Sequence, residues 1–405
     1  MQRCREVNIR CQRVWHVVVL SAGLLAASAC SPLTPGTIDL ASQTTVPFDL
    51  HGNHIYVRAS IDGQPYAFVL DTGGVASLTP ELAASLHLAT TGSVAVRGVG
   101  DGSSTVQIVR VPEIDVGGLR YRDGSYLVLP GLPLESPFGG VRFGGILGRE
   151  LFEKLVVKID YQHEQLSFIQ PAAFTIDPRS VALPVTMRRG AIPSVKATVD
   201  GKAGDFDIDA GSGQAVTLTQ QFAESSGLER EFGKSVNAEI GRGVGGALSG
   251  TVSRARMLSI ATFTLLNPIV EISATGIFAD SGFAGNIGAE ILRRFTITLD
   301  VPADLLYLRP NRNYAQPFLF NRAGLSVFKD ASGLHVTSII SGSPAAQAGI
   351  AVGDALVSVN GRPASRLDMA ALHDIWYGRV GDRVAMRLSR KGRIVRAAFE
   401  LRDLI

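Results

Sequence analysis

The chain has 405 residues, of which 46% are hydrophobic and 19% are charged, and its formal net charge is +3. This length and apolar content suffice for the packed cores of two or three domains. The small net charge, with no lysine or arginine cluster beyond the first residues, argues against a nucleic-acid partner. The 44 glycines favour a protein rich in strands and turns.

The N-terminus has the pattern of an export signal. Four arginines precede an apolar stretch at residues 17–27 that is too short for a membrane span, and residues 27–29 (ASA) form a cleavage pattern. The sequence LAASAC, which ends in Cys30, resembles a bacterial lipobox, whose cysteine is lipidated. After cleavage Cys30 would be the only cysteine, without an intramolecular partner. We expect a signal peptide at residues 1–29 and a tether at residues 30–45.

This pattern predicts export to the bacterial periplasm, with attachment to a membrane through lipidated Cys30. The alternative is a soluble periplasmic or secreted protein, in which Cys30 is an incidental thiol. We find no other segment of the sequence that could span a bilayer.

Two stretches of the sequence repeat each other. Residues 57–71 (VRASIDGQPYAFVLD) and 195–209 (VKATVDGKAGDFDID) align without a gap, and each reads as two strands around an Asp-Gly turn. Both copies continue with a helical pattern, an RGVG sequence, and a glycine that precedes a short helix and a hairpin. These landmarks lie at residues 77–88 and 217–228, 97–100 and 242–245, and 148–160 and 288–300. Their constant order indicates two copies of one lobe.

On these motifs the chain resembles the retropepsin-like aspartic proteases of the pepsin superfamily. The sequences DTGG at Asp71 and ILGRE at residues 146–150 match the family pattern closely. The resemblance implies a mainly β fold, a bilobal pair of acid-protease-like β-barrels with pseudo-twofold symmetry. Lobe 1 would span residues 46–172 and lobe 2 residues 180–310. Because both lobes lie in one chain, we expect a monomer to carry a complete cleft.

The resemblance implies that Asp71 and Asp209 are the catalytic pair of an aspartic endopeptidase. Peptide hydrolysis without a covalent intermediate needs a base for water and an acid for the carbonyl oxygen or the leaving amine. Two carboxyl groups a few ångströms apart share one proton, so the pair can supply both. The glycines that follow, Gly73 and Gly211, let backbone N–H groups approach the carboxylates.

The second copy departs from the family pattern at Ala210, where a Thr or Ser is usual. In the family that hydroxyl bonds to the opposite loop. Thr72 can do this from lobe 1 but Ala210 cannot reciprocate, a loss of about 1 kcal/mol. Ser212 follows the loop of lobe 2. We expect it to donate to Asp209 and to favour its ionised form, which would leave Asp71 more readily protonated.

Two glycine-rich stretches, at residues 97–105 and 241–250, are candidate flaps over the cleft. A flap would exclude water and bind the substrate backbone as an added strand. Glycines of ordinary hairpin turns are the alternative interpretation. The candidate flap glycines are Gly98, Gly100, Gly243 and Gly245.

The sequence favours neither a metal nor another cofactor. The three aspartates of DFDID suggest a calcium loop, but Ala210 and Val216 stand where an EF-hand loop needs Gly and Glu. The histidines of HGNH, His51 and His54, lack a third ligand at a recognisable spacing, and a surface pair is the simpler interpretation.

After the second copy the composition changes. Ser343 and Pro344 have the pattern of a helix N-cap and first helical residue, and Gly349 suits the position after the helix. An Asn-Gly turn, a helix at residues 366–376 and a final hairpin follow. On the runs GSPAAQAGI and GDALVSVNG, residues 317–405 resemble a small α+β PDZ domain of the bacterial protease type.

The PDZ resemblance implies a second binding site. Such domains bind an extended peptide by strand addition and capture its C-terminal carboxylate. Gly324, Leu325 and Ser326 would form the carboxylate loop, although they depart from the usual G-L-G-F sequence. The ligand would be a peptide or protein C-terminus.

These features predict an exported, membrane-attached aspartic endopeptidase, with polypeptide substrates and a PDZ domain that recruits or regulates. The alternative is a weakly active or inactive protease fold that binds peptides in its cleft and its PDZ groove, with Ala210 as a sign of decay. Two aspartates kept at equivalent positions favour the enzyme.

Overall fold

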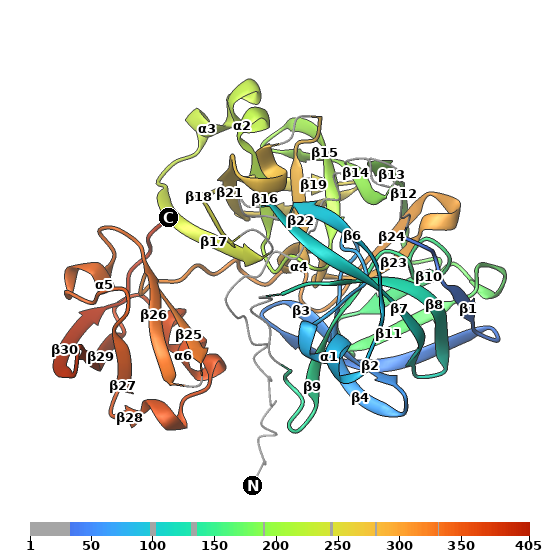
Figure 1. Ribbon diagram of the computed structural model, residues 1–405. Helices are drawn as coiled ribbons and strands as arrows, with labels where there is room; N and C mark the ends of the chain where they lie inside the picture. The colour runs from blue at the N-terminus through green and yellow to red at the C-terminus, as the bar shows by residue number, and fades with distance from the viewer. Residues whose placement is uncertain are drawn as a thin grey trace, which may run out of the picture.

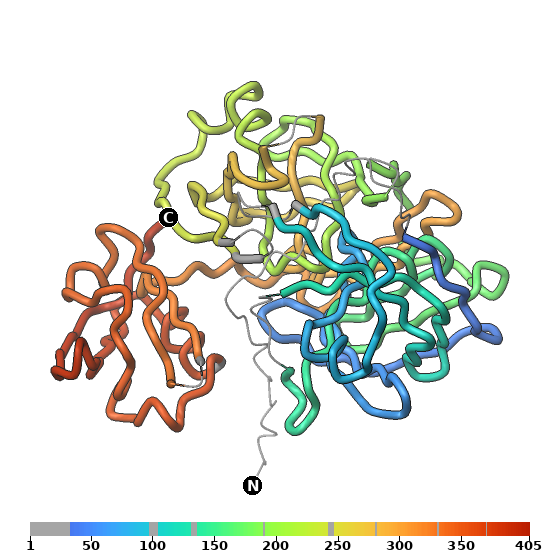
Figure 2. Tube along the Cα trace, viewed as in Figure 1, coloured from blue at the N-terminus to red at the C-terminus, as the bar shows by residue number. Residues whose placement is uncertain are grey.

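The computed structural model describes residues 33–97, 103–130, 136–188, 191–243, 246–279, 282–330 and 332–405. The predicted signal peptide, the proposed lipidation site Cys30 and the flap candidates Gly98, Gly100 and Gly245 lie outside these ranges. Strands β1–β11 form lobe 1, strands β12–β24 form lobe 2, and strands β25–β30 form a smaller C-terminal module (Figures 1 and 2).

Lobe 1 is a sheet in the order β2-β3-β4-β9-β5-β8-β7-β6, and a further pairing of β3 with β7 curls it toward a barrel. Its elements are β1 (Thr37–Asp39), β2 (Gln43–His51), β3 (His54–Ile61), β4 (Gln64–Leu70), β5 (Ser77–Leu78), α1 (Pro80–Ser85), β6 (Thr90–Arg97), β7 (Ser103–Val116), β8 (Leu119–Val128), β9 (Arg142–Leu147), β10 (Val156–Asp160) and β11 (Gln165–Ile169).

Lobe 2 repeats this arrangement in the order β17-β18-β21-β16-β22-β15-β14-β19-β20, and β15 lies parallel to β22 as β4 lies parallel to β9. Its elements are β12 (Val181–Pro184), β13 (Thr186–Arg188), β14 (Ile192–Val199), β15 (Lys202–Asp209), β16 (Val216–Thr219), α2 (Gln220–Ser226), α3 (Leu228–Glu231), β17 (Val236–Gly243), β18 (Gly246–Arg254), β19 (Met257–Ile260), β20 (Phe263–Leu266), β21 (Ile269–Ser273), β22 (Gly285–Gly288), α4 (Ala289–Leu292), β23 (Phe295–Asp300) and β24 (Leu305–Pro310).

The predicted Asp-Gly hairpins are confirmed in both lobes. Asp62 and Gly63, between β3 and β4, have φ values of 50° and 72°, and Asp200 and Gly201, between β14 and β15, have 47° and 83°. Two consecutive residues with positive φ make the turn whose twist matches that of hairpin strands.

Of the two helices predicted in each copy, the first is present in both lobes and the second in lobe 2 alone among the described residues. α1 and α2 each follow a threonine, Thr79 or Thr219, whose hydroxyl accepts a hydrogen bond of 3.2 Å from a backbone N–H of the first turn. The helix predicted near the end of each copy is α4 in lobe 2, whereas lobe 1 has successive turns at residues 149–154. No helix in the described ranges is both long and apolar enough to cross a membrane.

The two lobes join in one sheet, of order β12-β24-β23-β10-β11-β2. At its centre β10 of lobe 1 pairs antiparallel with β23 of lobe 2, and Lys158 lies opposite Thr298. These two residues occupy the same position in their copies, and Val156 opposite Asp300 mirrors Asp160 opposite Thr296. A twofold axis therefore passes between Lys158 and Thr298, which confirms the predicted pseudo-twofold symmetry of a mainly β, two-lobed fold.

The C-terminal module is a small α+β unit with the strand order β25-β26-β27-β29-β30. The hydroxyl of Ser343 accepts a hydrogen bond of 3.2 Å from Ala346 N, and Gly349 has a φ of 75°, so the short helix has the predicted cap and end. The elements are β25 (Leu325–Asp330), β26 (Gly333–Ile339), α5 (Pro344–Gln347), β27 (Ala355–Val359), β28 (Arg362–Pro363), α6 (Met369–Trp376), β29 (Arg383–Arg390) and β30 (Arg393–Glu400).

The end of the chain returns to lobe 2, next to β17 in Figure 1. Ile405 and Phe320 pack against a buried cluster that includes Ile240 of β17 and Phe278. Lys234 Nζ donates a hydrogen bond of 2.8 Å to the backbone oxygen of Asp403. The C-terminal tail thus fastens the module to the lobe-2 hairpin β17–β18.

Two equivalent glycines are required where β9 and β22 cross a neighbouring strand. Gly145 and Gly285 have φ values of 152° and 157°, and a Cβ on either would overlap a backbone oxygen, that of Ser77 or of Thr217. We expect Gly145→Ala and Gly285→Ala each to lower the free energy of unfolding by at least about 2 kcal/mol, measured by urea denaturation. Gly139→Ala, at a site with no atom within 4 Å, is the control. Equal stability of all three variants would contradict the expectation.

Candidate active site

Each of the two predicted aspartates lies where a strand reaches the lobe interface. Asp71 follows β4, and its N–H donates to the carbonyl of Leu147 in the parallel strand β9 at 3.0 Å. Asp209 ends β15 and lies beside Gly288 of the parallel strand β22. The same local architecture therefore presents both carboxyl groups, one from each lobe.

Asp71 is completely buried, with an exposed fraction of 0%. Its Oδ1 accepts hydrogen bonds from the N–H groups of Gly73 at 2.9 Å and Gly74 at 2.8 Å. A Cβ on Gly211 of the opposite lobe would lie 2.6 Å from Asp71 Oδ2. The carboxyl group thus reaches the Asp209 loop, and glycine is needed at position 211 because any side chain would overlap it.

Asp209 is held in a different way. Its Oδ1 accepts a hydrogen bond from Gly211 N at 2.8 Å, and its Oδ2 accepts one from the side-chain amide of Asn286 at 2.8 Å. Asp71 Oδ2 receives no hydrogen bond from a nitrogen donor in the described part of the chain. Each carboxyl group thus accepts two N–H hydrogen bonds, but both of those to Asp71 end on Oδ1, whereas Asp209 accepts one on each oxygen and one of them comes from a side chain.

Burial raises the pKa of Asp71 well above its usual range, and the nearby charge of Asp209 raises it further. The N–H groups of Gly73 and Gly74 oppose this shift without overcoming it. Two carboxyl groups in such contact titrate as a pair and hold one proton between them over a wide pH range. The geometry favours that proton on Asp71.

Thr72 joins the two aspartate loops. Its hydroxyl donates to the carbonyl oxygen of Ile208 at 2.6 Å and accepts from Ala210 N at 3.0 Å, both across the lobe interface. Ala210 is buried and has no hydroxyl with which to return these bonds. The lobes are therefore joined at this point from one side.

The prediction that Ser212 donates a hydrogen bond to Asp209 is wrong. The hydroxyl of Ser212 accepts a weak hydrogen bond of 3.4 Å from Gln214 N and lies in no hydrogen bond with Asp209. A side chain that does donate to Asp209 is Asn286, which sequence reasoning missed. A signal was present, because NIGAE in the second copy has Asn where ILGRE in the first has Ile146.

Two family models match parts of the sequence. Residues 57–151 match the family model described as aspartyl protease, and residues 335–390 match that of the PDZ domain. The chain therefore contains an aspartyl protease-like domain and a PDZ domain over these ranges. Among solved structures it is similar to the crystal structure of aspartic proteinase from Irpex lacteus, with 16% sequence identity, a TM-score of 0.42, and coverage of 67% of this chain and 98% of that chain. No curated protein matches the sequence.

His54 is a second contact between the protease lobes. Its exposed fraction is 2%, so the expected surface pair at HGNH is wrong for this residue. Burial lowers the pKa of His54 to about 4, although a hydrogen bond to the backbone of Gly211 works in the opposite direction. The imidazole is therefore neutral at neutral pH, next to the loop of Asp209.

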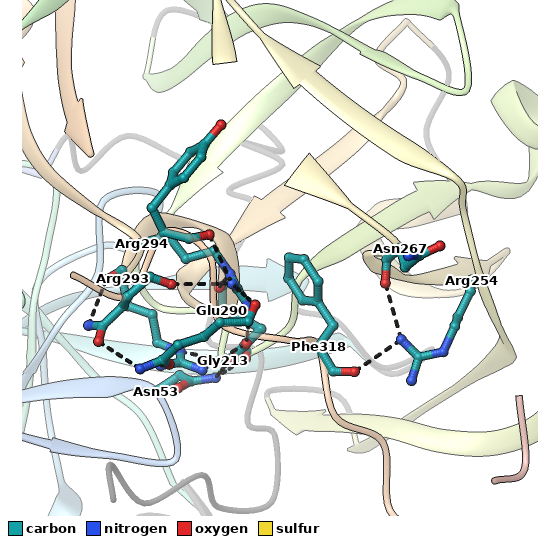
Figure 3. Close-up of polar contacts among 11 residues, drawn as sticks. Asn53, Gly213, Arg254, Asn267, Glu290, Arg293, Arg294 and Phe318 are labelled. Carbon is teal, nitrogen blue, oxygen red and sulfur yellow. Dashed lines mark hydrogen bonds and ion pairs between the residues drawn. The ribbon is translucent and has the colours of Figure 1, made fainter. Parts of the chain in front are cut away.

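A buried ion cluster lies next to Gly213, close to the Asp209 loop (Figure 3). The carboxylate of Glu290 pairs with Arg293 at 2.8 Å and Arg294 at 3.0 Å. Burial alone would raise the pKa of Glu290, but the two arginine charges lower it. The side-chain amide of Asn53, from lobe 1, donates to Glu290 at 3.0 Å and to the carbonyl of Gly213 at 2.8 Å. The cluster therefore links lobe 1 to the active-site loop of lobe 2.

The same cluster reaches the segment that leads to the PDZ domain. The guanidinium of Arg294 lies 3.6 Å from the centre of the Phe318 ring and donates to the carbonyls of Asn313 and Tyr314 at 3.4 Å each. On the other side of this segment, Arg254 donates to the carbonyl of Phe318 at 3.1 Å (Figure 3). The connection to the PDZ domain is thus anchored on lobe 2.

The acidic residue next to the site, Asp207, is paired within the protein. Arg188 Nε donates to both carboxylate oxygens at 2.9 Å, and the hydroxyl of Ser194 donates to Oδ1. The Arg188 guanidinium also lies 4.0 Å from the centre of the Phe283 ring. In the described part of the chain no group of three or more His, Cys, Asp or Glu side chains is arranged to hold a metal ion.

The remaining predicted residues lie in the lobe-2 hairpin β17–β18 and at the edge strand of the PDZ sheet. Of the flap candidates within the described ranges, Gly243 ends β17 opposite Gly246 of β18. In the PDZ domain, Gly324 has a φ of 71°, and Leu325 and Ser326 begin the edge strand β25, opposite Ile339 and Ser338. The proposed carboxylate loop therefore runs into the terminal strand of the sheet in the described part of the chain, the position at which strand addition occurs.

We expect Thr72→Val to lower the free energy of unfolding by at least about 2 kcal/mol, because it leaves two buried backbone groups without a partner. Thr72→Ser keeps the hydroxyl and is the control. Urea denaturation at neutral pH measures both variants. Equal stability of Thr72→Val and the unmodified chain would contradict the role of this hydroxyl.

We also expect His54 to make stability depend on pH. Because its pKa falls from 6.5 to about 4 on folding, His54 contributes stability that is present above pH 6.5 and lost as the pH falls toward 4. The loss is about 3 kcal/mol. His54→Gln should therefore lose less stability than the unmodified chain between pH 7 and about pH 4 in urea denaturation. His87→Gln, at an exposed histidine, is the control. If the free energy of unfolding of His54→Gln falls with pH as steeply as that of the unmodified chain, the expectation is refuted.

Proposed function

We propose that the chain is an aspartic endopeptidase that hydrolyses polypeptides with the Asp71–Asp209 pair. The observation that carries this proposal is the contact of two buried carboxyl groups from opposite lobes, of which one has a strongly raised pKa. Structural ion pairs are matched by opposite charges, whereas these two acids oppose each other. Such an arrangement costs stability and suits an acid and a base that act on one substrate.

In the proposed reaction the ionised Asp209 takes a proton from a water molecule, whose oxygen attacks the peptide carbonyl carbon. Protonated Asp71 donates its proton to the carbonyl oxygen, and a tetrahedral diol forms. Asp209 then gives its newly gained proton to the amide nitrogen while Asp71 takes one back from a hydroxyl of the diol, the C–N bond breaks, and an acid and an amine are released. No covalent enzyme intermediate is needed, because water is the nucleophile.

The surrounding features fit this proposal. The hairpins β6–β7 and β17–β18 would cover an extended substrate, and Gly98, Gly100, Gly243 and Gly245 stay the candidate flap glycines. The edge strand β25 of the PDZ domain would bind a peptide or protein C-terminus and recruit a substrate or regulator. Export and attachment to a membrane through lipidated Cys30 remain part of the proposal, as does action as a monomer.

A second function is favoured by one observation, the missing hydroxyl at Ala210. With the lobes joined only from Thr72, the carboxyl groups would be less well fixed, and the cleft would bind peptides with little or no hydrolysis. In that case the unmodified chain would bind denatured polypeptides but leave them intact between about pH 3 and pH 8.

We expect Asp71→Asn and Asp209→Asn each to abolish cleavage of a denatured protein mixture, because an amide can replace neither the acid nor the base. Product peptides are counted by mass spectrometry across acidic to neutral pH. The control is Asp123→Asn, at a side chain that is 63% exposed, which should cleave normally. Cleavage that persists in both active-site variants would refute the assignment of the pair.

A further inference from the structure

In each lobe, residues on neighbouring strands form one row across the sheet, next to the aspartate of that lobe. In lobe 1 adjacent strands place Tyr56 beside Val69, Val69 beside Ile146, Ile146 beside Ser77, and Ser77 beside Leu127. All five are buried, and four of the five are hydrophobic. The layer that flanks Asp71 therefore offers that carboxyl group no amide or charged partner.

In lobe 2 the same row is polar. The register places Ser194 beside Asp207, Asp207 beside Asn286, Asn286 beside Thr217, and Thr217 beside Glu271. These residues are also buried. Each pairing has its counterpart in lobe 1, so Asn286 occupies the position of Ile146. The two lobes thus share the same strand register, but the side chains of this row are mostly hydrophobic in lobe 1 and polar in lobe 2.

Asn286 is the member of this row that reaches the active site. Its Nδ2 lies 2.8 Å from Asp209 Oδ2, and its exposed fraction is 3%. Its Oδ1 is buried without a hydrogen-bond partner in the described part of the chain. A buried amide with an unsatisfied oxygen costs stability. The reverse orientation of the amide would place that oxygen against a carboxylate oxygen, so the observed orientation suits an ionised Asp209.

The other charged groups around Asp209 do not replace this donor. Asp71 and Asp207 are acids that repel a charge on Asp209, and Tyr161 is a buried phenol within its electrostatic reach. Arg188 is engaged with Asp207. Glu271, at the end of the row, accepts a hydrogen bond of 3.3 Å from Thr217, and burial raises its pKa well above the usual range. His54 bonds to the backbone of the Asp209 loop.

We propose that Asn286 is a positioning residue that makes Asp209 the ionised member of the pair and leaves the proton to Asp71. The inference rests on the proposed peptidase function for its catalytic consequence, but not for the ionisation itself. The amide stabilises the state with one proton by a charge-assisted hydrogen bond to Asp209. The apolar residue at the equivalent position of lobe 1 gives Asp71 no side-chain donor, so in the described part of the chain its N–H donors are the two backbone groups on Oδ1.

The test replaces the donor with an apolar side chain of similar size, Asn286→Leu. The acidic limb of the kcat/KM profile reports the first ionisation of the pair, and it should move upward by about one to two pH units. The basic limb, which reports the loss of the proton on Asp71, should stay in place. Ile146→Leu is the matched control in lobe 1, since neither side chain can donate, and it should move neither limb.

Two further measurements keep this inference separate from the proposed activity. Carbon-13 NMR of labelled aspartate carboxyl groups, with Asp209→Asn to assign the signal, should show the Asp209 titration shifted upward in Asn286→Leu. This readout does not need hydrolysis, so an inactive chain would refute the peptidase while the inference on Asn286 could still hold. If the leucine variant does not fold, Asn286→Ala removes the donor without adding bulk and should give the same shift. Unchanged titration of Asp209 in a folded variant would overturn the proposal.

Discussion

The contact of two buried carboxyl groups across the lobe interface is the constraint on which the rest of the structure depends. Like charges in a medium of low polarity repel strongly, so Asp71 and Asp209 stay together only if a proton is shared and the surrounding chain holds them. Much of the unusual local structure near the interface serves this purpose. It includes the glycines at 74 and 211, the single hydroxyl of Thr72, and the ion cluster next to Gly213.

The two aspartate loops are held by different kinds of hydrogen-bond donor. The Asp71 loop contributes two N–H groups and the bridging hydroxyl, whereas the Asp209 loop contributes one N–H group and relies on Asn286 from the next strand. Next to the second loop, two arginines compensate the charge of Glu290, and Asn53 links its carboxylate to the carbonyl of Gly213. The two lobes therefore differ at the aspartates and also in the residues that contact the aspartate loops.

Features set by short stretches of chain were predictable from the sequence. The Asp-Gly turns, the lobe repeat and the cap at Ser343 follow from residues adjacent in sequence, whose conformational preferences act locally. Asn286 and His54 were misjudged or missed because their roles depend on which strand lies beside them. His54 is buried by the opposite lobe, and Asn286 meets Asp209 only through the parallel pairing of β15 with β22. Contacts of that kind leave no periodic pattern in a single chain.

The twofold axis between Lys158 and Thr298 has a consequence for what each lobe can encode. An antiparallel pairing of a strand with its own counterpart is what a dimer of identical lobes would form, with the residue at the axis facing its own copy. In such a dimer one gene would specify both halves, and Asn and Ile could not occupy the same position. Two lobes in one chain are free of that restriction. Each half can carry its own residues, so an acid and a base can be encoded separately at the two equivalent positions.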